Sequence, residues 1–343
     1  MRTINVAVIG TGWCGGIRAE TSRASPYVGE LHIAETNAER LKVVADKTRP
    51  TSATDDYRKL LQIKDIDAVM ISATPEGLHY PMAKESLLAG KHVLLEKPMA
   101  LTLAEADDLI ALSRSRGLLF TIGYSQRFNP KFAYVKRCID DGTIGEPVSA
   151  LVSRHITRGL GNKISGRVKL SPAAMEATHD IDFVLWCMAP RRPVRVYAQE
   201  VSKIMKKAKV NAPDCCWIVV TMDDGAAFTV GAGWVLPPAY PNFATTWIEM
   251  VGTEGSVFVD DTHRDVVLNT TSKGIVFPIS TMPGEKVGHV YAGPMEAETI
   301  HFLDCVARGK QPLVTAEQAR LVMQIYQAAD VSAAENRPVE IAR

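Results

Sequence analysis

Residues 4–15, with the sequence INVAVIGTGWCG, decide the fold of the first part of the chain. Their first six residues form an apolar run that only Asn5 interrupts, and such a run predicts a buried β-strand. The glycines that follow, at positions 10, 12 and 15, have the spacing G-x-G-x-x-G, and an amphipathic stretch comes directly after them. A strand, this glycine spacing and a helix in that order are the fingerprint of a dinucleotide-binding βαβ unit.

The pattern continues to residue 123 as an alternation of short apolar runs and amphipathic stretches. Four more apolar runs lie at residues 31–34, 67–72, 92–95 and 118–123. Helical patterns lie at residues 15–25, 38–47, 81–89 and 104–116. Buried strands that alternate with helices indicate a parallel sheet with helices on both faces. We therefore predict an α/β Rossmann domain, with a doubly wound parallel sheet, over residues 1–123.

The remaining residues, 124–343, have a different pattern. After helical stretches at residues 129–140 and 171–188, strand-like runs follow one another and are separated by turn sequences such as Asp224-Gly225. Strands joined by short turns pair in the antiparallel sense. Helical stretches at 296–308 and 316–336 close the chain. We predict an α+β C-terminal domain with a large open, mostly antiparallel sheet, which binds substrate and forms the oligomer.

The aromatic residues of the predicted strands bear on oligomerisation. Trp217, Phe228, Trp234 and Trp247 all lie in this region, although the pattern does not assign each to a face of the sheet. An open sheet needs its uncovered face protected from water and from other sheet edges. We expect a homodimer or homotetramer that forms through the C-terminal sheet.

Composition and charge exclude several classes of partner. The 343 residues carry a net charge of +1, which provides no field for nucleic acid or an anionic membrane. No apolar run approaches the length of a membrane-spanning helix, and the first ten residues lack a signal-peptide layout. The six cysteines include no Cys-x-x-Cys pair, so we expect reduced thiols, no metal site and a cytoplasmic location. The expected partner is a small-molecule substrate.

The glycine loop is the predicted cofactor site. Gly10 permits a tight turn, Gly12 lets the backbone approach a pyrophosphate, and Gly15 allows helix and strand to pack closely. Glu35 ends the second apolar run, and a carboxylate there can accept hydrogen bonds from the adenosine ribose while repelling a 2′-phosphate. This favours NAD over NADP. Two alternatives remain: Arg40 could accommodate that phosphate, and Glu35 could be a solvated acid at a strand end.

Two further sequences lie at predicted carboxyl ends of parallel strands, where doubly wound sheets bind ligands. They are Ala73-Thr74-Pro75 and Glu96-Lys97-Pro98. Because the residue before a proline is restricted to extended conformations, Lys97 is expected in an extended turn at the crevice. A lysine beside a nicotinamide is a candidate acid/base group. The alternative is a surface lysine that anchors a loop.

His179 is the second candidate for proton transfer. In an α-helix, Glu176 and Asp182 would flank it at i−3 and i+3 on one face, and a carboxylate-braced imidazole carries protons at neutral pH. A structural histidine is the alternative interpretation. Arg154 and His155, on the strand after the crossover, offer positive charge to an anionic substrate group, although a solvated strand edge explains them equally simply.

Together these sequences resemble the Gfo/Idh/MocA oxidoreductase family over essentially the whole chain. The resemblance lies in VIGTGWCGG (8–16), in the long block 66–109, and in blocks 123–132, 142–147, 179–186 and 302–320. It implies a Rossmann domain, a C-terminal domain with a large open sheet, and NAD(P)-dependent hydride transfer on sugars, polyols or related cyclic hydroxy-compounds. It also implies that Lys97 contacts both the cofactor ribose and the reacting hydroxyl, and that His179 is the family histidine.

One departure from the family pattern concerns the residue four positions before the histidine. Many members carry aspartate there, whereas this chain has Met175, and Glu176 could take its place. We therefore expect an NAD-dependent dehydrogenase acting on CH–OH groups, with Lys97, His179 and Glu176 as catalytic residues. A dehydrogenase of a non-sugar cyclic diol and a non-catalytic dinucleotide-binding sensor are the alternatives; the presence of Lys97 argues against the sensor.

The expected ligand contacts complete the hypothesis. The residues expected to bind the cofactor are Gly10, Gly12, Trp13, Cys14, Gly15, Glu35, Ala73, Thr74, Pro75, His79, Glu96, Lys97, Gln126 and Arg127. The residues expected to bind the substrate are Lys97, Tyr124, Arg154, His155 and His179.

Overall fold

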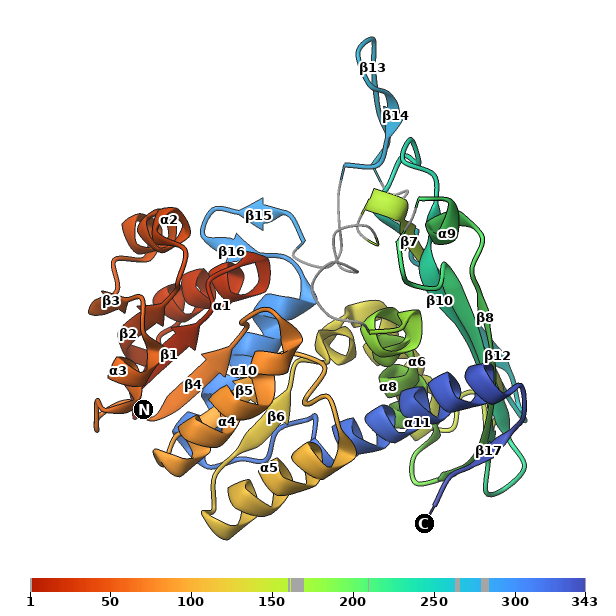
Figure 1. The fold of residues 1–343 in the computed structure, drawn as a ribbon, viewed down its shortest axis with the longest axis horizontal. Coiled ribbons are helices and arrows are strands. Elements are labelled where there is room, and N and C mark those ends of the chain that lie inside the picture. The colour runs from red at the N-terminus through yellow and green to blue at the C-terminus, as the bar shows by residue number, and fades with distance from the viewer. Residues whose placement is uncertain are drawn as a thin grey trace. The chain divides into compact units, whose positions relative to one another are not determined.

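The computed structural model describes residues 2–159, 161, 170–208, 210–262, 266–278 and 284–342. They form two compact units, Met1–Phe128 with Thr281–Arg320 and Asn129–Ser280 with Leu321–Arg343. The first unit thus takes in a late segment of the chain as well as the expected N-terminal residues. The last of the three boundaries, between Arg320 and Leu321, falls inside helix α11 (Ala316–Glu335). Figure 1 shows the elements of both units.

The first unit is built on a six-stranded sheet. Its strands are β1 (Ile4–Ile9), β2 (Val28–Ala34), β3 (Ser52–Thr54), β4 (Ala68–Ile71), β5 (His92–Leu95) and β6 (Phe120–Ile122). They lie in the order β3-β2-β1-β4-β5-β6, and every neighbouring pair is parallel. This confirms the predicted doubly wound sheet. The strand order reverses between β1 and β4, so the ligand-binding crevice is expected beyond the carboxyl ends of these two strands.

Helices connect these strands. They are α1 (Trp13–Ala24), α2 (Ala38–Thr48), α3 (Tyr57–Leu61), η1 (Glu76–Leu78), α4 (His79–Leu88), α5 (Leu103–Ser115) and η2 (Ser125–Phe128). Their ends follow local capping chemistry. Asn37 accepts a hydrogen bond at the start of α2, and Thr102 and Glu105 form a capping box at the start of α5.

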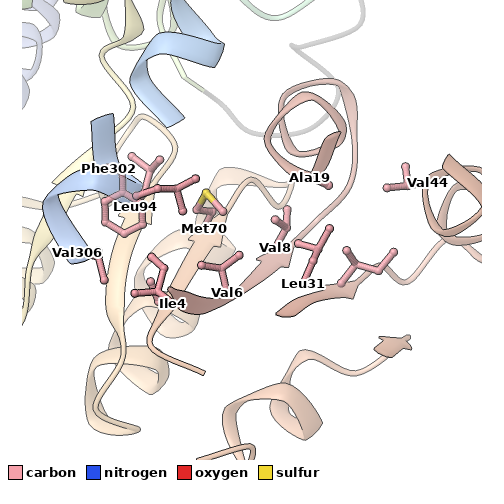
Figure 2. Packing of buried hydrophobic residues seen from close by; sticks show 13 residues of the cluster. Ile4, Val6, Val8, Ala19, Leu31, Val44, Met70, Leu94, Phe302 and Val306 are labelled. Carbon is pink, nitrogen blue, oxygen red and sulfur yellow. The ribbon is translucent and has the colours of Figure 1, made fainter. Parts of the chain in front are cut away.

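The late segment of the first unit holds a short hairpin and a helix. These are β15 (Lys286–Val287), β16 (Val290–Tyr291) and α10 (Pro294–Arg308). Figure 2 shows Phe302 and Val306 of α10 in one cluster with Ile4, Met70 and Leu94 from the sheet. Apolar burial against the sheet therefore places α10, which the sequence pattern assigned to the C-terminal domain, in the first unit.

The second unit is built on a seven-stranded sheet. Its strands are β7 (Pro147–Thr157), β8 (Pro193–Val201), β9 (Cys215–Met222), β10 (Ala227–Leu236), β11 (Ala244–Gly252), β12 (Ser256–Asp260) and β17 (Val339–Glu340). Their order is β12-β11-β7-β10-β9-β8-β17. Only the β7–β10 pair is parallel among these described strands, which confirms the open, mostly antiparallel sheet.

The second unit also contains helices and a small hairpin. They are α6 (Pro130–Asp140), a π-helical turn η3 (Ala173–Ala177), α8 (Thr178–Met188), α9 (Ile204–Lys207), β13 (Leu268–Thr270) and β14 (Gly274–Val276). The stretch 171–188 was expected as one α-helix; in the structure it begins with the π-helical turn. Among the described residues, no helix is long and apolar enough to cross a bilayer.

Candidate active site

The glycine loop between β1 and α1 fits a dinucleotide. Gly10 has a φ of 77°, and a Cβ on it would lie 2.7 Å from the Cα of Ala73, so only glycine can occupy this turn. A Cβ on Gly15 would overlap the carbonyl oxygen of Gly10. At Gly12, by contrast, no atom of the described residues other than those of its chain neighbours lies within 4 Å of a built Cβ. The loop therefore has an open side at Gly12, beside the N-terminus of α1, where a pyrophosphate can approach.

Glu35 lies at the carboxyl end of β2 and contacts this loop. Its Oε2 accepts hydrogen bonds from the Thr11 amide, across 2.7 Å, and from the Thr11 hydroxyl, across 3.2 Å. Its Oε1 accepts one from the Asn37 amide at 3.0 Å. Each carboxylate oxygen has two lone-pair directions, so the group can still accept from ribose hydroxyls. Glu35 is thus held at the glycine loop rather than being a solvated acid.

Arg40 contacts the same loop from α2. Its Nη2 donates to the Gly12 carbonyl oxygen across 2.8 Å, and its Nε donates to the Thr11 carbonyl oxygen. A Cβ on Gly16 would lie 2.5 Å from the Arg40 Nη2. The guanidinium therefore donates to backbone carbonyls of the glycine loop, while Glu35 accepts from the Thr11 amide of the same loop.

Two cis-proline turns follow β4 and β5. They are Thr74-Pro75 and Lys97-Pro98. His79 joins them, because its Nδ1 lies 2.6 Å from the Pro98 carbonyl oxygen and its Nε2 lies 3.0 Å from that of Ala73. His79 is buried, so it acts within the structure as a brace between the two strand ends. Lys97 lies on one of the braced turns and is partly buried.

Glu96, next to this lysine, is fixed at both its backbone and its side chain. Its amide donates to the Ile71 carbonyl oxygen at the end of β4, across 2.9 Å. Its Oε1 accepts a hydrogen bond from Arg18 Nη2 across 2.6 Å. Sequence reasoning missed Arg18; its position on the buried face of α1, three residues after Gly15, is the signal that could have revealed it.

The other residues of the first unit that were expected near the ligands differ in how far they are exposed to solvent. Trp13 is exposed at the start of α1. Burial and the charge of Glu96 raise the pKa of the neighbouring Cys14 thiol to about 12, so this cysteine is a protonated thiol at neutral pH. Tyr124, Gln126 and Arg127 are buried after β6.

Arg127 has partners from the late segment of the first unit. Its Nη1 donates to the Leu313 carbonyl oxygen across 3.1 Å and to the Gln318 Oε1 across 2.9 Å. These contacts anchor the turn after β6.

In the second unit, Glu176 has partners other than the expected one. Its Oε1 accepts a hydrogen bond from Trp234 Nε1 across 2.9 Å, and its Oε2 lies 3.9 Å from Arg154 Nη1. Glu176 lies in the π-helical turn, which has more residues per turn than an α-helix, so the α-helical i−3 spacing that suggested the brace does not apply there. Among the described residues, the contacts of this carboxylate do not include the expected brace of His179.

Arg154 and Asp180 form the ion pair beside His179. Arg154 Nε lies 3.1 and 2.9 Å from the two carboxylate oxygens of Asp180. Burial alone lowers the pKa of Arg154, but the charges of Asp180 and Glu176 raise it above its usual range. His179 is itself buried on α8. Sequence reasoning weighed Asp182 as the second acid of this helix; the pairing of Asp180 with Arg154 could not be read from spacing.

His155 lies on the other face of the sheet from Arg154. Successive strand residues point to opposite faces, and the His155 ring packs against Trp217, with centroids 5.9 Å apart. The structure therefore separates His155 from the face that carries Arg154, so the two residues do not share the expected substrate site. Within the described residues, no three His, Cys, Asp or Glu side chains gather in a group that could hold a metal ion.

Comparison with known proteins identifies the family. The sequence model of an oxidoreductase family with an NAD-binding Rossmann fold matches residues 4–124, and that of its C-terminal alpha/beta domain matches residues 136–341. The chain belongs to the Gfo/Idh/MocA oxidoreductase family. It is therefore an NAD(P)-dependent oxidoreductase, as the family resemblance implied.

Relatives of known activity match over nearly their full lengths. The chain is 27% identical to scyllo-inositol 2-dehydrogenase (NAD(+)) of Bacillus subtilis, over 98% of this chain and 96% of that one. It is 24% identical to myo-inositol 2-dehydrogenase of Thermotoga maritima, over 98% of both. The structure of scyllo-inositol dehydrogenase from Lactobacillus casei with NAD(H) and scyllo-inositol has a TM-score of 0.85 at 20% identity, with complete coverage of both chains, and shows the same fold.

Proposed function

We propose that this family member oxidises a CH–OH group of a cyclic polyol, a sugar or a related cyclic hydroxy-compound, with NAD as cofactor and Lys97 as the proton carrier. The observation that carries the proposal is the turn at the end of β5. Lys97 lies there between Glu96, which Arg18 holds, and Pro98, whose carbonyl His79 contacts. The activities named for the two inositol dehydrogenases support the substrate class.

The chain's own residues bind the cofactor and move the proton. Gly10, Gly12 and the N-terminus of α1 bind the pyrophosphate, and Glu35 accepts hydrogen bonds from the adenosine ribose. When bound there, NAD would supply the hydride-accepting chemistry. Lys97 takes the proton of the reacting hydroxyl, and His179 orients the substrate.

A preference for NAD over NADP follows from the charges at the end of β2. Glu35 presents a carboxylate where a 2′-phosphate would have to lie, and like charges repel. Arg40 is the cation that sequence reasoning weighed as a partner of such a phosphate. Its guanidinium donates hydrogen bonds to the carbonyl oxygens of Thr11 and Gly12. The carboxylate therefore dominates recognition at this position.

An assembly through the seven-stranded sheet completes the proposal. One face of that sheet exposes large apolar side chains, including Trp217 at 39% and Trp247 at 42%, whereas Trp234 and Phe228 are buried on the other face. Trp217 lies flat on the sheet, because a Cβ on Gly231 would be 2.5 Å from its ring. A broad exposed aromatic face is typical of an interface, and we propose that two copies of the chain cover it in a homodimer or homotetramer. The six cysteines form no disulfide, which supports a cytoplasmic location.

The experiment is a profile of cyclic polyols, sugars and non-sugar cyclic diols with NAD, followed by Lys97→Ala on the best substrate. We expect kcat at saturating NAD to fall about 10²- to 10⁴-fold, the usual contribution of a positioned acid/base group. Lys42→Ala, on the exposed side of α2, is the control and leaves kcat unchanged. Near-complete activity of Lys97→Ala would refute the assignment. Tight NAD binding without turnover of any compound would favour a dinucleotide sensor.

A further inference from the structure

A buried ion-pair cluster lies in the first unit, around Arg18 of α1. Arg18, on α1, has a side chain that is only 1% exposed. Its Nη2 lies 2.6 Å from Glu96 Oε1 and 2.8 Å from Glu298 Oε2. Its Nη1 lies 3.4 Å from the Thr299 hydroxyl. The cluster therefore joins α1, the end of β5 and helix α10, three segments far apart in the sequence.

The charges of the cluster keep the guanidinium ionised. Burial by itself lowers the pKa of Arg18, but the charges of Glu298 and Glu96 raise it above its usual range. One cation and two carboxylates leave a net charge of about −1 if all three are ionised. A buried arrangement of this kind is weak support for stability, because desolvation opposes the attraction between the charges. A role in placing another group explains it better.

Space around the cluster is restricted. A Cβ on Gly123, at the end of β6, would lie 3.0 Å from Arg18 Nη2 and 3.2 Å from Glu96 Oε2. The Glu96 carboxylate is therefore confined from the β6 side while Arg18 binds it. Glu96 directly precedes Lys97 in the chain, and the charges of both residues act on the Cys14 thiol, as do those of Arg18 and Glu298. The cluster and the Lys97 amine therefore share one electrostatic environment around Cys14.

We propose that Arg18 and Glu298 are positioning residues for proton transfer. Arg18 engages the Glu96 carboxylate, so that Glu96 serves as the partner of Arg18 instead of neutralising Lys97, and Glu298 balances the charge of Arg18 from α10. This inference rests on the proposed function, in which Lys97 carries the proton. The late segment of the chain thereby takes part in preparing a catalytic residue on β5.

The test measures how fast a small amine-specific acylating reagent labels Lys97 in the full-length protein, without NAD or substrate, using peptide mass spectrometry. In Arg18→Met, the carboxylates of Glu96 and Glu298 lose their cation, so the added net negative charge favours the protonated Lys97 amine and labelling slows about threefold to tenfold. In Glu298→Gln, the cluster loses a negative charge and labelling becomes faster by a similar factor. Simple loosening of the structure would accelerate labelling in both variants.

Kinetics supply the second measurement. At saturating NAD and substrate, Arg18→Met lowers kcat about tenfold and moves the acid limb of the kcat–pH profile to higher pH, whereas Glu298→Gln moves that limb to lower pH. Arg18→Lys, which keeps the charge but makes fewer contacts, recovers part of the loss. Arg58→Met breaks an exposed ion pair with Glu85 in the same unit and is the matched control; it leaves both readouts unchanged.

The outcomes separate this inference from the proposed function. Equal labelling rates in the wild type and both variants, or shifts of the same sign in both, overturn the positioning role. If Arg18→Met does not fold, Glu96→Gln replaces it and must accelerate labelling, as Glu298→Gln does. Labelling needs no turnover, so activity retained by Lys97→Ala would refute the catalytic assignment while leaving the labelling result interpretable.

Discussion

The indole Nε1 of Trp234 donates a hydrogen bond to Oε1 of Glu176 across 2.9 Å, and both side chains are buried. Trp234→Phe removes this donor and leaves a buried carboxylate oxygen with one partner fewer. Loss of a hydrogen bond to a charged group costs about 1.5–3 kcal/mol, and we expect the free energy of unfolding to fall by that amount. Denaturant-induced unfolding measures it.

A double-mutant cycle distinguishes this pairing from the brace that spacing alone suggested. The stability effects of Trp234→Phe and Glu176→Gln should be non-additive, because the two side chains are in contact. The effects of Glu176→Gln and His179→Ala on kcat should add. Strong non-additivity in kcat would restore Glu176 as the direct partner of His179 and contradict the structural assignment.

Cofactor choice gives a second prediction. Glu35→Ser removes the carboxylate that repels a 2′-phosphate. The dissociation constant of NADP divided by that of NAD should therefore fall roughly tenfold to a hundredfold. Calorimetric titration of both dinucleotides measures the ratio. Glu39→Ser, at the exposed start of α2, is the control. If the wild-type protein binds NADP as tightly as NAD, the prediction is wrong and Arg40 is the candidate partner of the 2′-phosphate.

Local chemistry explains which parts of the site could be predicted. The glycine loop is specified within six residues, since Gly10 needs a positive φ and Gly15 needs close approach, so its sequence alone defines it. The alternation of strands in 1–123 likewise reflects burial on both faces of the sheet. The predicted ends of β1 and β5 agree with the structure to the residue.

Long-range pairing explains what could not be predicted. Arg18 and Glu298 are 280 residues apart, and no local pattern indicates that α10 packs on the first sheet. The strand β3 has three residues, too few to show a period. The π-helical turn at Ala173–Ala177 alters the direction of Glu176, and hydrophobic periodicity does not distinguish such a turn from an α-helix.

The exposed face of the seven-stranded sheet leads to a third prediction. Trp247 and Phe258 lie side by side on neighbouring strands of this face, with ring centroids 6.3 Å apart. Trp247→Glu places a charge where apolar contact is proposed, so it should shift the mass found by light scattering from oligomer toward monomer. Tyr134→Glu, at a site on α6 that is 51% exposed against 42% for Trp247, should leave the mass unchanged. A wild-type monomer at micromolar concentration would contradict the proposed assembly.

Asp330, on α11, gives the last prediction, which concerns stability and pH. Burial raises the pKa of its carboxyl group to about 6, against a smaller opposing effect of a hydrogen bond from Ser171. The pKa of Glu200 on β8 is raised as well, mainly by burial and to a smaller extent by the charge of Asp330. An unfolded aspartate has a pKa near 3.9, so the folded state holds the proton more tightly. The Asp330 contribution therefore favours folding below about pH 4 and is lost as pH rises toward 6.

Above that range, ionised Asp330 destabilises the folded state by about 1–3 kcal/mol, from about 1.4 kcal/mol for each unit of pKa shift. Asp330→Asn cannot ionise, so it should be more stable than the wild type by that amount at pH 7.5 and nearly equal to it at pH 4. Urea unfolding across pH 4–8 measures the difference, with Asp46→Asn on the exposed side of α2 as the control. If the Asp330→Asn and wild-type stabilities run parallel across this range, Asp330 does not carry the raised pKa. If Asp330→Asn is less stable at pH 7.5, its ionised carboxylate makes favourable contacts that outweigh its burial.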